Sequence, residues 1–223
     1  MGASTGPKVN GLQNAILKID ASNFSSYIGV GNTINSITSG QKLTGSGVTF
    51  ISNKGESCFS FGGAGTVTSY LNIGITGNTN RTFSCWVKFT SKTNQAVFSL
   101  GTNGVGNGYG IETTPTVWQF NFGSVGSATT ITYNANQWYY VSCVGQKIDT
   151  FNHNVKLYIN GVLQSSVGFT YISTTNSTLK LGTNPAGTLN LSGFISKLSV
   201  YDKVLKSEEI LNNYNNFKSR YGY

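Results

Sequence analysis

Carboxylate side chains, which would be needed for acid–base hydrolysis, are few in this chain and widely scattered. The seven are Asp20, Glu56, Glu112, Asp149, Asp202, Glu208 and Glu209. A typical glycosidase places two carboxyl groups about 5 to 10 Å apart, flanking the bond that is cleaved. No predicted strand carries alternating acids on one face, and the adjacent Glu208 and Glu209 are explained by the positive end of a predicted helix dipole. We therefore expect no catalytic residue and no enzymatic activity, and an atypical glycosidase is the weakest hypothesis.

Nucleophilic and metal-binding side chains do not form a recognisable set either. His153 is the one histidine, and it lies in a polar, turn-like segment without a nucleophile elbow elsewhere in the chain. The cysteines are Cys58, Cys85 and Cys143, an odd number without a C-x-x-C spacing, and each lies within an apolar run. We expect buried free thiols that act as small hydrophobic groups, and no metal site.

Aromatic side chains give the one candidate binding surface, because a sugar stacks its apolar face on a flat ring. Alternation places Trp86 and Tyr158 on strand faces opposite the predicted core, with Lys88, Lys156 and Gln119 on similar faces. These five residues are the predicted ligand-binding set. The alternative is structural: Trp86 packs beneath the terminal helix or a long loop.

The balance of charge is basic, with a formal net charge of +8 from 15 basic and 7 acidic residues. Such a balance favours acidic partners, yet the lysines are scattered, and phosphate recognition concentrates basic side chains on one face. We therefore expect no nucleic-acid partner. No apolar stretch approaches a membrane span, and the start of the sequence lacks the apolar region of a signal peptide, so we expect synthesis in the cytoplasm and no membrane association.

Short alternating runs separated by glycine, asparagine, serine and threonine predict an all-β protein. Asn160-Gly161 predicts a hairpin with a type I′ turn, and a slip in alternation predicts a bulge near Ser196. One helix is predicted over residues 207–219, with Ser207 as its N-cap. The region over residues 29–55 has the weakest pattern, which indicates a long loop or irregular strands. The predicted strands are Ala15–Ile19, Cys58–Phe61, Tyr70–Ile75, Thr82–Phe89, Ala96–Leu100, Tyr109–Glu112, Val117–Phe122, Thr129–Tyr133, Trp138–Val144, Val155–Ile159, Val162–Val167, Thr178–Leu181 and Phe194–Tyr201.

These elements predict a flexible arm over residues 1–10 and one domain over residues 11–223, a two-sheet antiparallel β-sandwich with a short C-terminal helix. Three stretches resemble the laminin G-like branch of the concanavalin A-like jelly rolls. They are Thr82-Phe-Ser-Cys-Trp-Val-Lys88, the pair Trp138-Tyr-Tyr-Val141 and Val155-Lys-Leu-Tyr-Ile-Asn-Gly161, and Gly193-Phe-Ile-Ser-Lys-Leu-Ser-Val-Tyr-Asp202 with Leu205 and Ser207-Glu-Glu-Ile210. The resemblance runs over roughly residues 56 to 217.

Two further motifs resemble phage and other viral structural proteins that carry this domain. One is the opening Leu17-Lys-Ile-Asp-Ala-Ser-Asn-Phe-Ser-Ser-Tyr27, and the other is the ending Tyr214-Asn-Asn-Phe-Lys-Ser-Arg-Tyr-Gly222. The resemblance implies a non-enzymatic virion protein, a capsid decoration or fibre-associated module, with capsid or other virion proteins as partners, a location in the virion and a homo-oligomeric state. The alternative is a lectin-type module that binds host glycans.

The same relatives often carry an acidic pair after an F-D-G strand, where calcium binds. This chain has Phe61-Gly-Gly-Ala-Gly65 at that position. Because calcium prefers several carboxylate or carbonyl oxygens, the loss of the pair argues against a calcium site of the family type. We expect no cofactor.

Overall fold

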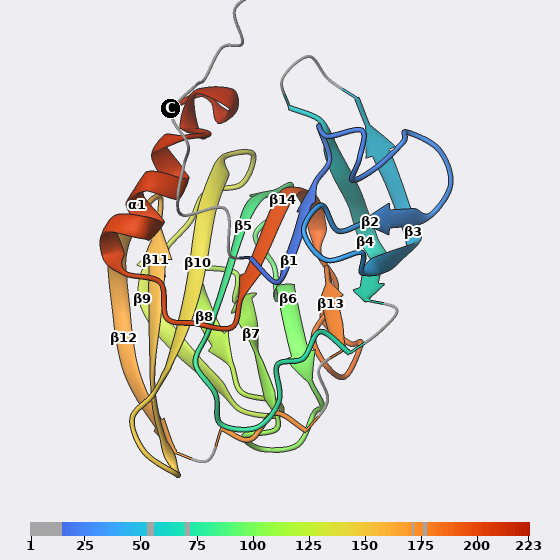
Figure 1. Cartoon of the computed structure of the whole chain (residues 1–223). Helices are drawn as coiled ribbons and strands as arrows, with labels where there is room; N and C mark the ends of the chain where they lie inside the picture. The colour runs from blue at the N-terminus through green and yellow to red at the C-terminus, as the bar shows by residue number, and fades with distance from the viewer. Residues whose placement is uncertain (1–14, 53–55, 70–71, 171, 176–177) are drawn as a thin grey trace, which may run out of the picture.

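An antiparallel path of hydrogen-bonded strands folds over into two layers (Figure 1). The computed structural model describes residues 15–52, 56–69, 72–170, 172–175 and 178–223, so the predicted arm over residues 1–10 lies outside the described residues. The first layer runs in the order β12 (Val162–Thr170), β11 (Asn152–Ile159), β10 (Trp138–Lys147), β5 (Arg81–Phe89), β14 (Ser192–Tyr201) and β4 (Cys58–Ser69). The second continues through β13 (Leu179–Leu181), β6 (Gln95–Gly101), β7 (Gly108–Thr113), β8 (Val117–Asn121) and β9 (Gly126–Thr132).

Strand β4 joins the two layers. Its first half pairs with β14, in a register that places Phe59 opposite Ile195, and its second half pairs with β13 at Val67 and Thr68. At the other end of the path β12 approaches β9, and the stacked rings of Phe122 and Phe169, 4.0 Å apart, connect the two edges. The expected two-sheet jelly roll is confirmed, with one bent strand belonging to both sheets.

Three N-terminal strands extend the first layer and position the site described below. Strands β2 (Thr33–Asn35) and β3 (Lys42–Ile51) extend the free edge of β4, where sequence patterning predicted only a loop or irregular strands (Figure 1). Strand β1 (Leu17–Asp20) pairs with the second half of β14. The predicted strand Tyr70–Ile75 is wrong over residues 72–75, and residues 70–71 lie outside the described part of the chain.

Alternation along the strands fills the space between the layers with apolar side chains. Phe83, Cys85, Val87 and Phe89 of β5 are all buried there, as predicted. The register of β14 against β5 shifts between Ile195 and Lys197, which confirms the bulge at Ser196. Asn160 and Gly161 both have positive φ, 52° and 83°, as a type I′ turn requires.

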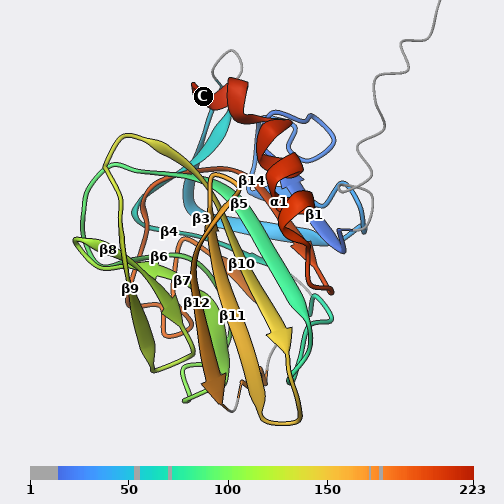
Figure 2. The same ribbon diagram turned by 90° about the vertical axis from the view of Figure 1, so that its left-hand side faces the viewer.

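Figure 2 shows helix α1 (Ser207–Asn215) lying over the outer face of the first layer. A second apolar cluster lies between the C-terminal segment and that face. The predicted helix is shorter than expected: α1 ends early and is followed by the 3₁₀ helix η2 (Lys218–Tyr221). Lys206 rather than Ser207 is the N-cap, because the Glu209 carboxylate accepts a hydrogen bond of 2.8 Å from the Lys206 amide. None of the helices in the described ranges is long and apolar enough to cross a bilayer.

Candidate functional site

The predicted aromatic platform is covered by the C-terminal segment. Trp86 is 1% exposed and stacks on Tyr221 with ring centroids 3.9 Å apart. Tyr158 is 4% exposed, and its hydroxyl lies 3.1 Å from that of Ser207 at the start of α1. The interpretation in which Trp86 packs beneath the terminal segment is therefore what the structure shows, and neither ring is open to a ligand in this structure.

The three polar members of the predicted set do not converge. The Lys88 ammonium lies over the rings of Trp138 and Phe194, 4.9 and 5.1 Å from their centroids. Lys156 on β11 reaches across to β10, where its ammonium lies 3.5 Å from the Gln146 side-chain oxygen. Gln119 lies on β8 in the other layer. Trp86 and Tyr158 share the covered apolar cluster, but the three polar residues lie apart from one another, so the five residues do not form one pocket.

The opening and closing sequence motifs meet in a charged cluster that ties the ends of the described chain together. The Asp20 carboxylate pairs with the buried Lys197 ammonium and lies 3.5 Å from the Arg220 guanidinium. The Lys197 ammonium also lies 3.8 Å from the centre of the Phe217 ring. Burial lowers the pKa of Lys197 to about 8, and the Asp20 charge opposes that shift. The Asp20 carboxylate also accepts a hydrogen bond from the Ser22 amide and so caps the turn after β1.

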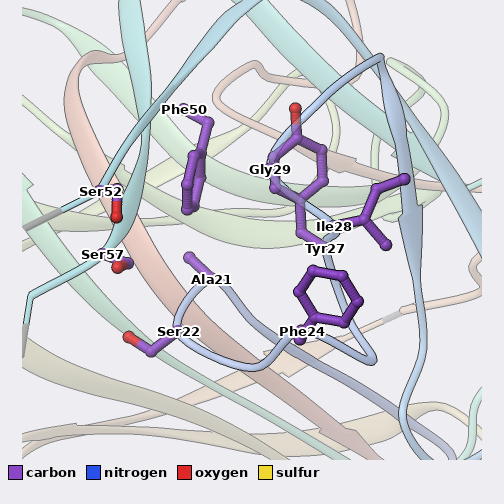
Figure 3. A pocket seen from close by; sticks show the side chains of 9 residues that line it. All are labelled: Ala21, Ser22, Phe24, Tyr27, Ile28, Gly29, Phe50, Ser52 and Ser57. Carbon is purple, nitrogen blue, oxygen red and sulfur yellow. The ribbon is translucent and has the colours of Figure 1, made fainter.

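A cavity lies under the loop that leaves β1, directly after Asp20 in the chain (Figure 3). Its volume is about 260 Å³. Figure 3 shows the serine side chains on one side and Phe24, Tyr27 and Ile28 on the other. The lining residues are Ala21, Ser22, Phe24, Tyr27, Ile28, Gly29, Phe50, Ser52 and Ser57.

Aromatic rings make up the apolar part of this pocket. Tyr27 packs 4.8 Å from Phe50 and edge-on against Phe59 at 5.4 Å, so its ring is held in place. Phe24, by contrast, is 75% exposed at the rim. An exposed large ring beside a hollow marks a contact surface, because burying it on a ligand releases water from apolar area.

Local hydrogen bonds hold the loop that carries these rings. The Asn23 carbonyl accepts the amides of Ser26 and Tyr27 at 2.9 and 3.0 Å. The buried Ser26 hydroxyl donates to the Asn35 carbonyl on β2, and the Tyr27 hydroxyl donates to the Gly31 carbonyl at 2.7 Å. The loop therefore presents Phe24 from a fixed backbone, which lowers the entropy lost when a ligand binds.

Two carboxylates outside the pocket accept hydrogen bonds from neighbouring groups of the fold. Burial raises the pKa of Glu112 to about 7, and Asn121 donates a 2.7 Å hydrogen bond to its carboxylate. Asp149 caps its own turn by accepting the Phe151 and Asn152 amides. Within the described ranges no three His, Cys, Asp or Glu side chains gather as a metal site, and the glycines after Phe61 offer calcium no carboxylate.

The cysteines are free and buried, as predicted. Burial raises the pKa of Cys58 to about 11 and that of Cys143 to about 12. Thiols with such values stay protonated at neutral pH and are poor nucleophiles.

Sequence patterning missed the pocket because its walls come from separate segments. The loop after β1 supplies one wall, and β3 with the residues around Ser57 supplies the other. One signal was present: Phe24 stands between asparagine and serine in a polar run, where a large ring has no local apolar partner.

Comparison with known proteins identifies the fold independently. No curated protein sequence matches the chain. A structure of botulinum neurotoxin type C, described as depending on two ganglioside molecules for entering cells, is 17% identical with a TM-score of 0.70. The match covers 93% of this chain and 52% of the toxin chain, so this chain spans about half the length of such toxin domains.

Two more solved structures have the same fold. The receptor-binding domain of botulinum neurotoxin type G is 15% identical, with a TM-score of 0.66 over 91% of this chain and 51% of the other. Domain 4 of AbnA, a GH43 extracellular arabinanase from Geobacillus stearothermophilus, in complex with arabinotriose, is 18% identical with a TM-score of 0.63. Here the coverage is 89% of this chain and 97% of the arabinanase domain.

The sequence itself matches a laminin G-type family over residues 60–211, which is more than half of the chain. All nine lining residues of the pocket fall outside that stretch. The chain belongs to the concanavalin A-like lectin/glucanases superfamily.

Proposed function

We propose that this chain is a non-enzymatic, lectin-like module that binds carbohydrate in the pocket beneath the loop after β1. The observation that carries the proposal is the combination of a fixed aromatic wall, an exposed Phe24 at the rim and serine hydroxyls opposite them. Rings take the apolar face of a sugar, and hydroxyl and backbone groups take its hydroxyls. Small-molecule sites combine an apolar lining with a few placed polar groups in the same way.

The fold neighbours agree with this proposal. Domain 4 of the arabinanase, which matches this chain nearly end to end, was solved with arabinotriose. The botulinum neurotoxin type C structure concerns an interaction with gangliosides, which are glycolipids. Carbohydrate is thus the ligand class that these two structures have in common.

Binding rather than hydrolysis is favoured by the carboxylates. Glycosidic hydrolysis needs two carboxyl groups on either side of one sugar. No described residue that lines the pocket carries a carboxyl group. Asp20, the acid nearest in sequence to the pocket loop, is already paired with Lys197 and Arg220.

A screen of the purified protein on an array of plant, microbial and animal glycans tests the proposal. We expect saturable binding to a defined subset, reproduced in solution by calorimetry. Binding to none of the glycans by either method, with a folded protein, would refute the carbohydrate-binding function.

The virion role is a second candidate, and it rests on the opening and closing motifs alone. Part of these motifs has a role in the fold, through the contacts among Asp20, Lys197, Phe217 and Arg220. A structural role explains those residues without a virus particle, so the motifs support the virion role less strongly. Capsid partners, a homo-oligomeric state and a location in the virion stay predictions of that candidate. Salt-sensitive loading of the protein onto purified candidate shells, followed by mass photometry, would support it, and no loading would argue against it.

A further inference from the structure

We propose that the pocket beneath the loop after β1 recognises a single uncharged sugar ring, with Phe24 as the residue that determines affinity. This inference rests on the proposed carbohydrate-binding function and adds to it the class of sugar, the number of sugar units and the residue that holds them.

The size of the pocket indicates one ring. Drug-sized ligands occupy pockets of about 300 to 1,000 Å³. The cavity here is about 260 Å³ and lies below that range. It therefore has room for one sugar unit between Phe50 and the Phe24 rim, and the remaining units of a glycan would lie outside in water.

The charge at the pocket indicates an uncharged sugar. The described lining residues are apolar, aromatic, glycine or serine, and none of them is ionisable. Among the described residues, the Lys197 and Arg220 cations beside the start of the pocket loop are committed to Asp20. A carboxylate or sulfate on the ligand would lose its hydration without gaining a hydrogen-bonded cation in the pocket. The free-energy cost of that desolvation exceeds the attraction to the net charge of +8, because salt screens charges that lie farther away.

The construction of the loop points to Phe24 as the main contact. The turn over residues 20–27 is fixed by the Asn23 carbonyl and the Ser26 hydroxyl, so Phe24 is held at the rim although its ring contacts little of the protein. Rigid aromatic anchors supply large contact area at low entropic cost. Tyr27 and Phe50 form the floor and wall, but their rings also pack on Phe59 and contribute to the fold.

The pocket lies outside the part of the chain that the family match covers. The matched stretch, residues 60–211, holds most of the strands of the sandwich, whereas β1, β2, β3 and the pocket loop precede it. Loops grafted on a shared fold are where binding specificity resides.

The test compares Phe24→Ala with Phe151→Ala, a matched control at another exposed phenylalanine (55% exposed) that lies outside the pocket. Both variants and the parent protein are applied to an array of neutral, sialylated and sulfated glycans, and to calorimetry with the best neutral glycan and its terminal monosaccharide. Thermal unfolding checks that both variants are folded.

We expect neutral glycans to bind, about tenfold or greater weakening in Phe24→Ala, and no change in Phe151→Ala. We also expect the terminal monosaccharide to bind within about threefold of the full glycan. Binding of glycans that Phe24→Ala leaves intact would overturn the assignment of the site but keep carbohydrate binding as the function.

Three other outcomes would also overturn the inference. Binding confined to sialylated or sulfated glycans would refute the uncharged class, and affinity that rises with each added sugar would refute the single ring. Phosphatidylcholine vesicles that bind the parent protein but not Phe24→Ala, with no glycan bound by either, would identify the rim of Phe24, Ile28 and Val30 as a lipid contact, and the proposed function would fail with it.

Discussion

Glu112 gives this protein a dependence of stability on pH whose sign and size follow from the structure. Its side chain is 3% exposed, and burial raises its pKa from 4.5 to about 7. Since the folded state holds the proton more tightly than the unfolded state, the stability that this group provides is complete below pH 4.5 and is lost as the pH rises through 7. The shift corresponds to about 3 kcal/mol, or roughly 6 to 12 °C in the melting temperature of a domain of this size.

The perturbation is Glu112→Gln, which keeps the shape of the protonated acid and an oxygen that accepts the Asn121 hydrogen bond. We expect the variant to match the parent protein near pH 4 and to be more stable by about 3 kcal/mol at pH 8. Urea unfolding from pH 4 to 8.5 measures both curves. Their difference isolates Glu112 from His153, whose pKa burial lowers and whose contribution runs in the opposite direction.

Glu208→Gln is the matched control, because it removes the same charge from an exposed position on α1. Its stability should follow the parent curve at each pH, apart from a small helix-dipole effect. Parallel curves for Glu112→Gln and the parent protein would refute the reasoning, since they would mean that Glu112 is as well solvated in the folded state as in the unfolded state.

Three further substitutions test other parts of the fold. The buried Arg81 guanidinium donates to loop carbonyls and to Thr174, and Arg81→Met would leave these acceptors unpaired. The substitution should therefore lower the free energy of unfolding in urea by about 2 to 4 kcal/mol, and a loss below about 0.5 kcal/mol would contradict this. Asp20→Asn should cost about 3 kcal/mol at pH 7 by leaving a buried ammonium without its counter-ion, and the loss should shrink towards pH 10 as that ammonium deprotonates. Gly161→Ala should lower the melting temperature by several degrees, because an added Cβ lies 2.8 Å from Leu211 at a positive φ; an unchanged melting temperature would show that α1 gives way without cost.

The sandwich was predictable because its strands obey local rules. Alternation on β5, β8 and β11 identified the buried faces, and Asn160-Gly161 and Ser196 marked a turn and a bulge. β2 and β3 were missed because β3 contains glycines and exposed residues where apolar residues would alternate, and pairing with β4 stabilises it instead.

The binding surface was much less predictable, because it depends on what covers each face. Trp86 and Tyr158 do point away from the central core, as alternation required, yet the C-terminal segment lies over both. The sequence alone did not indicate Phe24 as a binding residue, although it lies within the opening motif. Its significance depends on a pocket wall that β3 contributes from a distant part of the chain.

The C-terminal cover also has a consequence for the order in which the protein is made. Synthesis runs from the N-terminus, so β14, α1 and η2 emerge after the strands that they cover or pair with. Until Tyr221 is made, Trp86 and Trp138 lack the ring that packs against them, and β1 lacks its partner strand β14. We therefore expect the partly made domain to expose an aromatic face until the C-terminal segment emerges, and exposed apolar surface of this kind favours aggregation.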